Sequence, residues 1–295
     1  MTHQLICPVC AQALVRSENQ RSVSCASGHL FDYAKQGYLN LLLSQHKKSK
    51  QPGDTAEMVQ ARTNFLNSGF YQGIADYLIR ECISSLLGQP KENKSRNEAY
   101  HYCDLACGEG FYTQQIHQFL GENLSYEKLA SCGMDISSPA IKAACKRDKS
   151  IQWLIASLAR IPLADHSQDL ASGLFFHFDL QEIQRILKPG GFFIMVTTGP
   201  EHLIQLREQI YDTIKPETLK DFSKAELPSP LEHLKTLHYT EQKHLTGKDR
   251  ILDLLTMTPH YWRCKPEKKQ SLETLQELNL TLDIQIDLFK HSVTL

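Results

Sequence analysis

The sequence predicts an α/β protein with a mostly parallel sheet, helices on both faces, an antiparallel edge strand and a small N-terminal domain. Three observations predict this fold class. Between residues 101 and 198, short apolar stretches alternate with helical patterns, which is typical of right-handed βαβ units. Residues 103–111 run from the first such stretch through small side chains, as a strand-to-helix turn requires. Three of the nine cysteines lie in the first 25 residues, which sets that segment apart.

Composition limits what the chain can be. It has 295 residues, of which 41 % are hydrophobic, enough to bury a large core and to form two domains. The formal net charge is −1, so affinity for nucleic acid would have to come from a local basic patch. No apolar run is long enough to span a membrane, and residues 1–10 lack the features of a secretory signal. We therefore expect a cytoplasmic protein without a membrane partner.

The first element of the chain is a candidate metal site. Cys7 and Cys10 are separated by two residues, and Cys25 and His29 follow further along. The first spacing lets both thiolates face one ion, and the second pair would complete a tetrahedral zinc site. A segment this short buries too little apolar surface to fold alone, so zinc would supply folding free energy and keep no open coordination position. A pair of redox thiols is the alternative, but it leaves Cys25 and His29 unexplained.

The segments beside this site admit more than one interpretation. Alternating residues around Val15 and Val23 predict two short strands. Residues 30–45 are aromatic and then apolar, and we expect them to pack the small domain against its neighbour, with stacking on nucleic-acid bases as the less favoured alternative. Residues 46–53 are basic, which suits either a solvated linker or a loop that contacts phosphate groups.

Two helices are expected ahead of the sheet. Asp54 or Thr55 would cap the first helix, and Glu57 follows Asp54 at the spacing of a capping box. An Asn-Ser-Gly sequence at 67–69 would end that helix. Residues 71–87 carry apolar side chains at helical spacing and predict the second helix.

The elements of the sheet follow in order along the chain. We expect strands at 101–106, 129–135, 151–156, 169–176 and 192–198, with helices at 112–120, 138–147 and 179–187 between them. Two later segments alternate as strands do and would form the antiparallel edge, at 235–245 and 280–290, with a helix at 247–257. Because ligands bind at the carboxyl ends of the strands in such sheets, the site should lie beside residues 106–110.

The turn after the first strand suits a nucleoside ligand. Gly108 and Gly110 have no Cβ, so a ligand could approach bare peptide groups at the start of a helix. Asp135 ends the next strand, where a carboxylate can accept hydrogen bonds from ribose hydroxyls. Capping the following helix is the alternative role for Asp135. The spacing from Asp104 to Gly110 is not that of a dinucleotide-binding fingerprint, which favours a different ligand.

Four motifs in this order, at residues 104–110, Asp135, residues 156–165 and Asp169, resemble those of class I S-adenosylmethionine-dependent methyltransferases, which have a Rossmann-like fold. The resemblance implies that the turn contacts the methionine part of the cofactor, that Asp135 holds the ribose, and that the segment from 156 flanks the adenine. The cofactor-binding residues would then be Asp104, Gly108, Glu109, Gly110, Asp135, Ala156 and Ser157.

A second set of motifs spans almost the whole chain. It comprises the Cys and His cluster, KQGY at 35–38, PGDTAEM at 52–58, GPEHL at 199–203 and MTP at 257–259. With these motifs the chain resembles the bacterial large-subunit ribosomal RNA guanine-N1 methyltransferases. The resemblance implies a ribosomal RNA partner and adds Tyr71 and His202 to the cofactor contacts. From the residues alone, Tyr71 would be a core aromatic and His202 a residue at the start of a helix.

The same resemblance assigns the domains. A zinc-binding, RNA-recognition domain would be followed by a basic linker with a helix and by the methyltransferase domain, at residues 1–45, 46–70 and 71–295. The zinc would be structural and remote from the methyl group. The sequence leaves open whether the protein forms a homodimer.

The catalytic group is the least defined part of the prediction. Residues 174–179 follow the fourth strand, where the acceptor lies in class I enzymes, and they differ from the segment typical of the family. His177 and Asp179 are candidates to assist removal of the guanine N1 proton, although a packed or solvent-facing His177 is the more usual outcome. The alternatives are methylation of another RNA base, a protein or a small molecule, and a non-catalytic RNA-binding module.

Overall fold

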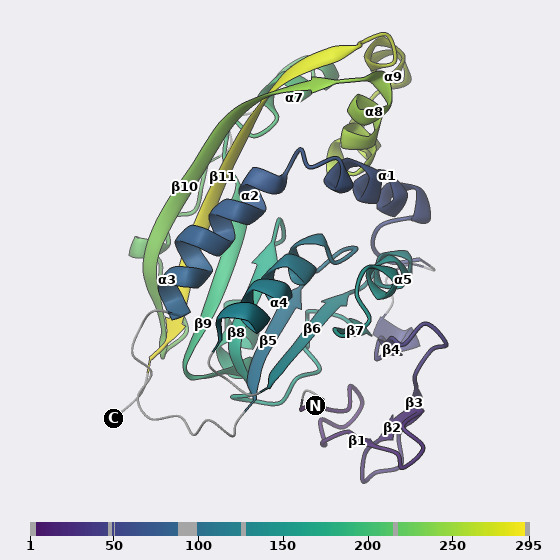
Figure 1. Ribbon diagram of the computed structural model, residues 1–295, viewed down its shortest axis with the longest axis vertical. Coiled ribbons are helices and arrows are strands. Elements are labelled where there is room, and N and C mark those ends of the chain that lie inside the picture. Colours follow the sequence, from purple (N-terminus) through teal and green to yellow (C-terminus); the bar gives the residue numbers. More distant parts are fainter. Residues whose placement is uncertain are drawn as a thin grey trace.

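The computed structural model describes residues 4–46, 49, 51–87, 99–124, 128–214 and 218–292, which fold around two sheets (Figure 1). The small sheet is antiparallel, in the order β1 (Val15–Arg16), β2 (Ser22–Ser24) and β3 (Leu30–Asp32). The strands expected around Val15 and Val23 are therefore confirmed. The chain just before Cys7 attaches this sheet to the rest, because the N–H of Ile6 donates to the carbonyl of Pro162 at 3.1 Å.

The large sheet has eight strands in the order β10-β11-β9-β8-β5-β6-β7-β4. All neighbouring pairs are parallel except those of β11 with β9 and with β10, which confirms a mostly parallel sheet with an antiparallel edge. The strands are β4 (Leu39–Asn40), β5 (Tyr100–Leu105), β6 (Leu129–Asp135), β7 (Gln152–Ile155), β8 (Gln168–Leu174), β9 (Leu187–Thr198), β10 (Leu231–Thr246) and β11 (Glu277–His291).

Two strands differ most from expectation. β4 comes from the segment assigned to the small domain, yet it pairs with β7 because Leu39 is fully buried among the side chains of the large core. β9 starts at Leu187, five residues before the predicted start, since Leu187 already pairs with Gln168 of β8. Backbone pairing, which apolar periodicity does not report, sets both boundaries.

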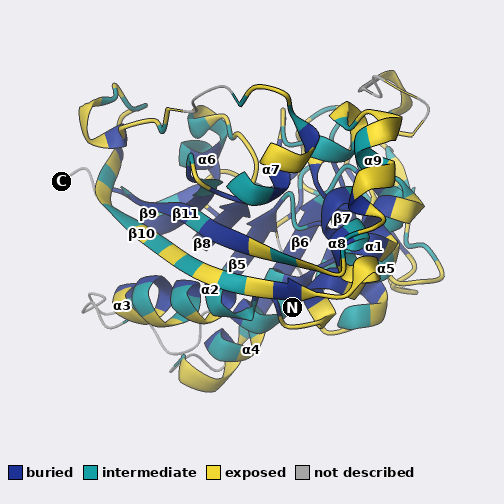
Figure 2. Cartoon of the chain, turned by 90° about the horizontal axis from the view of Figure 1, so that it is seen from above, coloured by how far each residue is buried: buried dark blue, intermediate teal, exposed yellow. Residues whose placement is uncertain are grey.

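Helices cover both faces of the large sheet. Figure 2 shows α2, α3 and α4 on one side and α6 and α7 on the other. The α-helices are α1 (Ala56–Asn67), α2 (Gln72–Tyr77), α3 (Ser84–Leu87), α4 (Phe111–Asn123), α5 (Ser138–Arg147), α6 (Leu180–Ile186), α7 (Ile204–Ile210), α8 (Lys248–Thr256) and α9 (Pro266–Leu272). Short 3-10 helices are η1 (Ser44–His46), η3 (Phe222–Lys224) and η4 (Pro259–Arg263). Among the described residues, no helix combines the length and the apolarity that crossing a bilayer would need.

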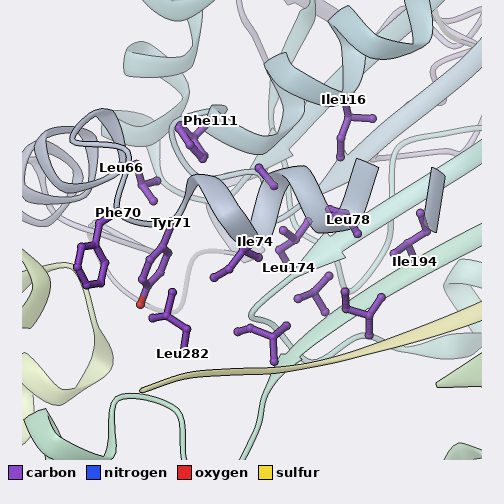
Figure 3. Packing of buried hydrophobic residues seen from close by; sticks show 14 of the residues in the cluster. Leu66, Phe70, Tyr71, Ile74, Leu78, Phe111, Ile116, Leu174, Ile194 and Leu282 are labelled. Carbon is purple, nitrogen blue, oxygen red and sulfur yellow. The ribbon is translucent and has the colours of Figure 1, made fainter. Parts of the chain in front are cut away.

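The two helices ahead of the sheet are present, with differences in detail. Thr55, and not Asp54, caps α1, and its Oγ1 accepts from the N–H of Met58 at 3.3 Å. The single helix expected at 71–87 is helical throughout but is interrupted by a π-helical segment, η2 (Leu78–Ile83), between α2 and α3. Figure 3 shows Ile74 and Leu78 packed toward Leu174 and Ile194 of the sheet. This packing fixes the residues just before α2 above the carboxyl ends of the strands.

Candidate active site and metal centre

The four predicted metal ligands lie together at the small sheet. Sγ of Cys7, Cys10 and Cys25 and Nδ1 of His29 all lie within 4.8 Å of one another. Sγ of Cys10 is 3.6 Å from Sγ of Cys25, which is 3.3 Å from Nδ1 of His29. Tetrahedral zinc with Zn–S bonds of about 2.3 Å sets ligand atoms roughly 3.8 Å apart. The cluster therefore fits one zinc ion with four protein ligands, which is a structural site.

The turn between β5 and α4 uses its two glycines differently. Gly108 and Gly110 have φ of +55° and +83°, and Ala106 adopts a similar left-handed conformation at +56°. A Cβ on Gly110 would lie 2.6 Å from the ring of Trp153, so Gly110 allows the helix to pack closely. A Cβ on Gly108 would meet only the side chain of Arg62, at 3.6 Å. Gly108 is buried, and the Arg62 side chain of α1 is what lies over it.

Asp104, on β5, stabilises this turn through hydrogen bonds. Its Oδ2 accepts from Oγ1 of Thr113 at 2.5 Å and its Oδ1 from Oγ of Ser172 at 2.8 Å. These bonds tie β5 to α4 and β8. Burial raises the pKa of Asp104 to about 6. Both oxygens are thus used within the protein, and Asp104 supports the turn through Thr113.

Asp135 faces the turn, as the ribose assignment requires. Its Oδ2 accepts from the N–H of Gly108 at 3.0 Å and its Oδ1 from the N–H of Ser137 at 2.8 Å. The cap of α5 is Ser137, whose Oγ accepts from the N–H of Ala140 at 3.2 Å. Burial raises the pKa of Asp135, and the two backbone N–H groups oppose that shift. A carboxylate offers about four lone-pair positions, so Asp135 keeps capacity to accept further hydrogen bonds.

The predicted adenine contacts lie directly beside this carboxylate. The N–H of Ala156 donates to the carbonyl of Asp135 at 3.1 Å. Ala156 is buried and Ser157 is half-buried, and both follow the carboxyl end of β7. The structure therefore brings residues 108, 135, 156 and 157 to one edge of the sheet.

Glu109 is buried and pairs with Arg147 of α5. Its Oε2 accepts from Nε of Arg147 at 2.7 Å, which opposes the rise in the pKa of Glu109 that burial causes. Its Oε1 has no hydrogen-bond partner among the described residues, and neither has the buried hydroxyl of Tyr112 on α4. Buried polar atoms are normally paired. Two orphaned atoms beside the turn fit a site that a polar ligand completes.

Tyr71 and His202 meet although they are far apart in sequence. The hydroxyl of Tyr71 lies 3.3 Å from Nε2 of His202, whose Nδ1 accepts from the N–H of Asp283 at 3.2 Å. Burial, with His260 and Arg207 nearby, lowers the pKa of His202 to about 3, so the ring is neutral. Since Nδ1 is an acceptor, the proton is on Nε2 and is donated to Tyr71. The hydroxyl proton of Tyr71 is then available to a ligand.

Arg62 is a site residue that the sequence reasoning missed. It extends from α1, pairs with Asp54 and donates from Nη2 to the carbonyl of Met257 at 2.8 Å. The carbonyl of Asp54 accepts from Oγ of Ser137 at 2.7 Å, beside Gly53. Residues 53–62 therefore lie against the turn and α5 and cover the site. The available signal was that Arg62 is the one basic residue of a helix that is otherwise apolar, polar or acidic.

Aromatic side chains occupy the segment after β8, where the sequence predicts the acceptor. Phe175 and Phe176 are 39 % and 48 % exposed, which is unusual for phenylalanine. Phe175 has φ of +60°, and its ring lies nearly parallel to that of His202, with 6.4 Å between centroids. The ring of Phe175 also packs against that of Tyr112, with 6.2 Å between the ring centroids. An apolar surface therefore adjoins the predicted cofactor contacts.

The two candidate proton acceptors are placed just beyond these rings. Asp179 caps α6, and its Oδ1 accepts from the N–H of Gln181 at 2.9 Å. His177 is exposed. Neither placement assigns a catalytic role, and both residues stay predictions.

Known protein families match both the N-terminal metal-binding segment and the sheet that carries the candidate cofactor site. Residues 5–50 match the family described as "RlmA, N-terminal", a zinc ribbon, and residues 103–195 match a methyltransferase domain. A Bacillus subtilis protein named "Putative 23S rRNA (guanine-N(1)-)-methyltransferase YxjB" is 27 % identical over 290 residues, which cover 95 % of this chain and 94 % of that protein. A 23S rRNA (guanine(748)-N(1))-methyltransferase of Streptomyces fradiae is 30 % identical over 203 residues, 68 % of this chain and 66 % of that protein.

The chain belongs to the RlmA-type 23S rRNA guanine-N1 methyltransferase family. Membership confirms the resemblance drawn from the motifs, the class I methyltransferase fold and the use of S-adenosylmethionine. It also agrees with the geometry of the metal cluster, since the RlmA-type zinc ribbon covers all four ligands.

Proposed function

We propose that this chain methylates N1 of a guanine in 23S rRNA with S-adenosylmethionine as the methyl donor. The observation that carries the proposal is the hydrogen bond from the N–H of Gly108 to Asp135. It joins a glycine turn and a carboxylate at the carboxyl ends of adjacent parallel strands, where α/β sheets bind nucleosides. The relatives that match along the chain, which are named as 23S rRNA methyltransferases, support the choice of acceptor.

We assign the cofactor site to the residues gathered at this edge. S-adenosylmethionine, when bound, supplies an electrophilic methyl group on a sulfonium. Asp135 would accept hydrogen bonds from the ribose, while Ala156 and Ser157 would flank the adenine.

Gly108 and Glu109 would line the methionine end of the cofactor, where the hydroxyl of Tyr71 can donate its free proton. Arg62 covers this end, and its charge would attract a carboxylate.

The acceptor base would enter over Phe175, the exposed aromatic beside His202. His202 itself is excluded as the base that removes the N1 proton. Its Nδ1 already accepts a backbone hydrogen bond, its Nε2 carries the proton, and its pKa is lowered to about 3. His177 and Asp179 stay the predicted candidates for proton removal, and water is a further acceptor. Alignment of the base with the methyl group would supply most of the rate enhancement.

The partner and location follow from the same proposal. The partner would be ribosomal RNA, met in the cytoplasm, with the domain of residues 1–45 and the linker of residues 46–70 contributing to its recognition. Association into a homodimer stays a prediction, which sedimentation of the purified protein would measure.

Mapping the product tests the proposed function. The protein would be incubated with methyl-labelled S-adenosylmethionine and a 23S rRNA transcribed in vitro, which carries no modification. We expect label in 1-methylguanosine at one position. Label in another nucleoside would overturn the choice of guanine N1, and label in protein alone would overturn the RNA substrate. If S-adenosylmethionine does not bind at all, the result would favour a non-catalytic RNA-binding module.

A further inference from the structure

The segment from η4 to α9 carries an exposed tryptophan. The chain has two tryptophans, of which Trp153 is 2 % exposed and Trp262 is 67 % exposed. Trp262 contacts the ring of Tyr261 edge-on, at 5.3 Å between centroids. Tryptophan is normally mostly buried, so an indole that packs against one ring and leaves its other side open is a candidate contact for a partner.

Basic residues lie close to this indole in the sequence. Residues 257–269 contain four basic side chains and one acidic side chain, a net +3 in a chain of net charge −1. Lys265 and Lys268 pair with Asp212 at 3.0 and 3.3 Å, which lowers the local charge to +2. Asp212 is 65 % exposed, and exposed pairs of this kind are weak. The lysines therefore remain able to bind other anions.

The segment that carries this surface starts beside the candidate active site. The segment begins at Met257, whose carbonyl accepts from Arg62 of the site cover. Nδ1 of His260 lies 2.8 Å from the hydroxyl of Tyr211, and His260 is among the groups that lower the pKa of His202. Trp262 follows two residues later. In Figure 1, α8 and α9 lie near α1 at the top of the molecule, whereas β1–β3 lie at the bottom.

We propose that Trp262, Arg263, Lys265, Lys268 and Lys269 form an RNA-docking surface, in which the indole stacks on an unpaired base and the cations bind phosphates next to the target guanine. The partner's identity rests on the proposed function. Stacking of bases on exposed aromatics among basic side chains is how proteins bind single-stranded RNA. A protein partner fits less well, because lysine is depleted in protein–protein interfaces. The zinc ribbon and this surface would then hold the RNA at two ends.

Tryptophan fluorescence reports directly on this surface, since Trp153 is buried. Adding the in vitro 23S rRNA transcript should quench part of the emission of the wild-type protein. The variant Trp262→Phe should lose that change while keeping the emission of Trp153. In a binding titration, Trp262→Ala should weaken affinity for the transcript by about 5- to 150-fold, the range measured for loss of one base stack. The affinity for S-adenosylmethionine should not change.

Two further variants separate stacking from charge and from general surface effects. Arg263→Gln should reduce the slope of log affinity against log salt by about 1, as expected for one lost phosphate contact. Leu234→Ala is the control, because Leu234 is 40 % exposed and lies near the start of the 16-residue strand β10, whereas the end of β10 leads into α8 and the docking surface. Its RNA affinity should equal that of the wild type.

The outcomes distinguish this surface from the proposed function. If Trp262→Ala binds the transcript within about twofold of the wild type, or RNA leaves the emission unchanged, the docking surface is overturned even though methylation continues. If the wild type itself fails to methylate or bind the transcript, the proposed function fails first. Emission that changes with protein concentration in the absence of RNA would assign the surface to a second copy of the chain and overturn the RNA proposal.

Discussion

The zinc ribbon and the cofactor turn are both built from closely spaced polar groups, yet they are stabilised in different ways. In the small sheet, Val15 and Leu30 are 67 % and 61 % exposed, so apolar burial contributes little. In the large sheet, every residue of β8 is buried. The metal-ligand atoms of the small domain converge on one point where a zinc ion would bind, whereas the polar groups of the turn are held by a sheet with cores on both faces. Changes at the two sites should therefore have separable effects.

Loss of zinc should have the largest effect. Structural zinc contributes on the order of 10 kcal/mol to the folding of such modules, so Cys7→Ser or a strong chelator should unfold the small domain. Methylation of rRNA should be abolished, while S-adenosylmethionine still binds. Metal analysis should find one zinc per wild-type chain. Cys264→Ser, outside the cluster, is the control for zinc content and cofactor affinity only; a cofactor affinity that falls together with zinc content would contradict the separation.

Substitutions at the two glycines of the turn should lower the stability of the protein by different amounts. In Gly110→Ala the new Cβ would lie 2.6 Å from Trp153 at φ of +83°, which should lower the free energy of unfolding by about 2–4 kcal/mol. Gly108→Ala meets only Arg62 at 3.6 Å and should cost about 1 kcal/mol. Urea unfolding measures both. Equal losses in the free energy of unfolding would show that the close approach of Gly110 to Trp153 does not contribute to stability.

His202 should make stability depend on pH. Its folded pKa of about 3 lies below the ordinary 6.5, so the neutral ring contributes stability that is present above pH 6.5 and lost as the pH falls toward 3. The loss should approach 1.4 kcal/mol per pH unit between about pH 6 and 4. His202→Asn should remove this part of the slope in urea unfolding at several pH values. An unchanged slope would contradict the neutral, buried ring.

Some of this site could be predicted from the sequence because chemistry restricts it locally. Zinc requires Cys and His at short spacings, so Cys7, Cys10, Cys25 and His29 were identifiable without the fold. The turn and Asp135 could be predicted because parallel strands place their carboxyl ends together.

The rest depends on contacts between distant segments. Arg62 reaches Met257, which is 195 positions away in sequence, and β4 is a strand only because β7 offers it a partner. The tautomer of His202 depends on the N–H of Asp283. No local pattern encodes such pairs, so periodicity and spacing could not supply them.

Titration calorimetry of S-adenosylmethionine with Asp135→Ala tests the central claim most directly, since the claim is that the turn and this carboxylate hold the nucleoside. We predict an affinity about 10- to 100-fold below that of the wild type, equivalent to lost hydrogen bonds to a charged group. Asp148→Ala, at the other end of α5, should bind as the wild type does. An affinity of Asp135→Ala equal to that of the control would contradict the account.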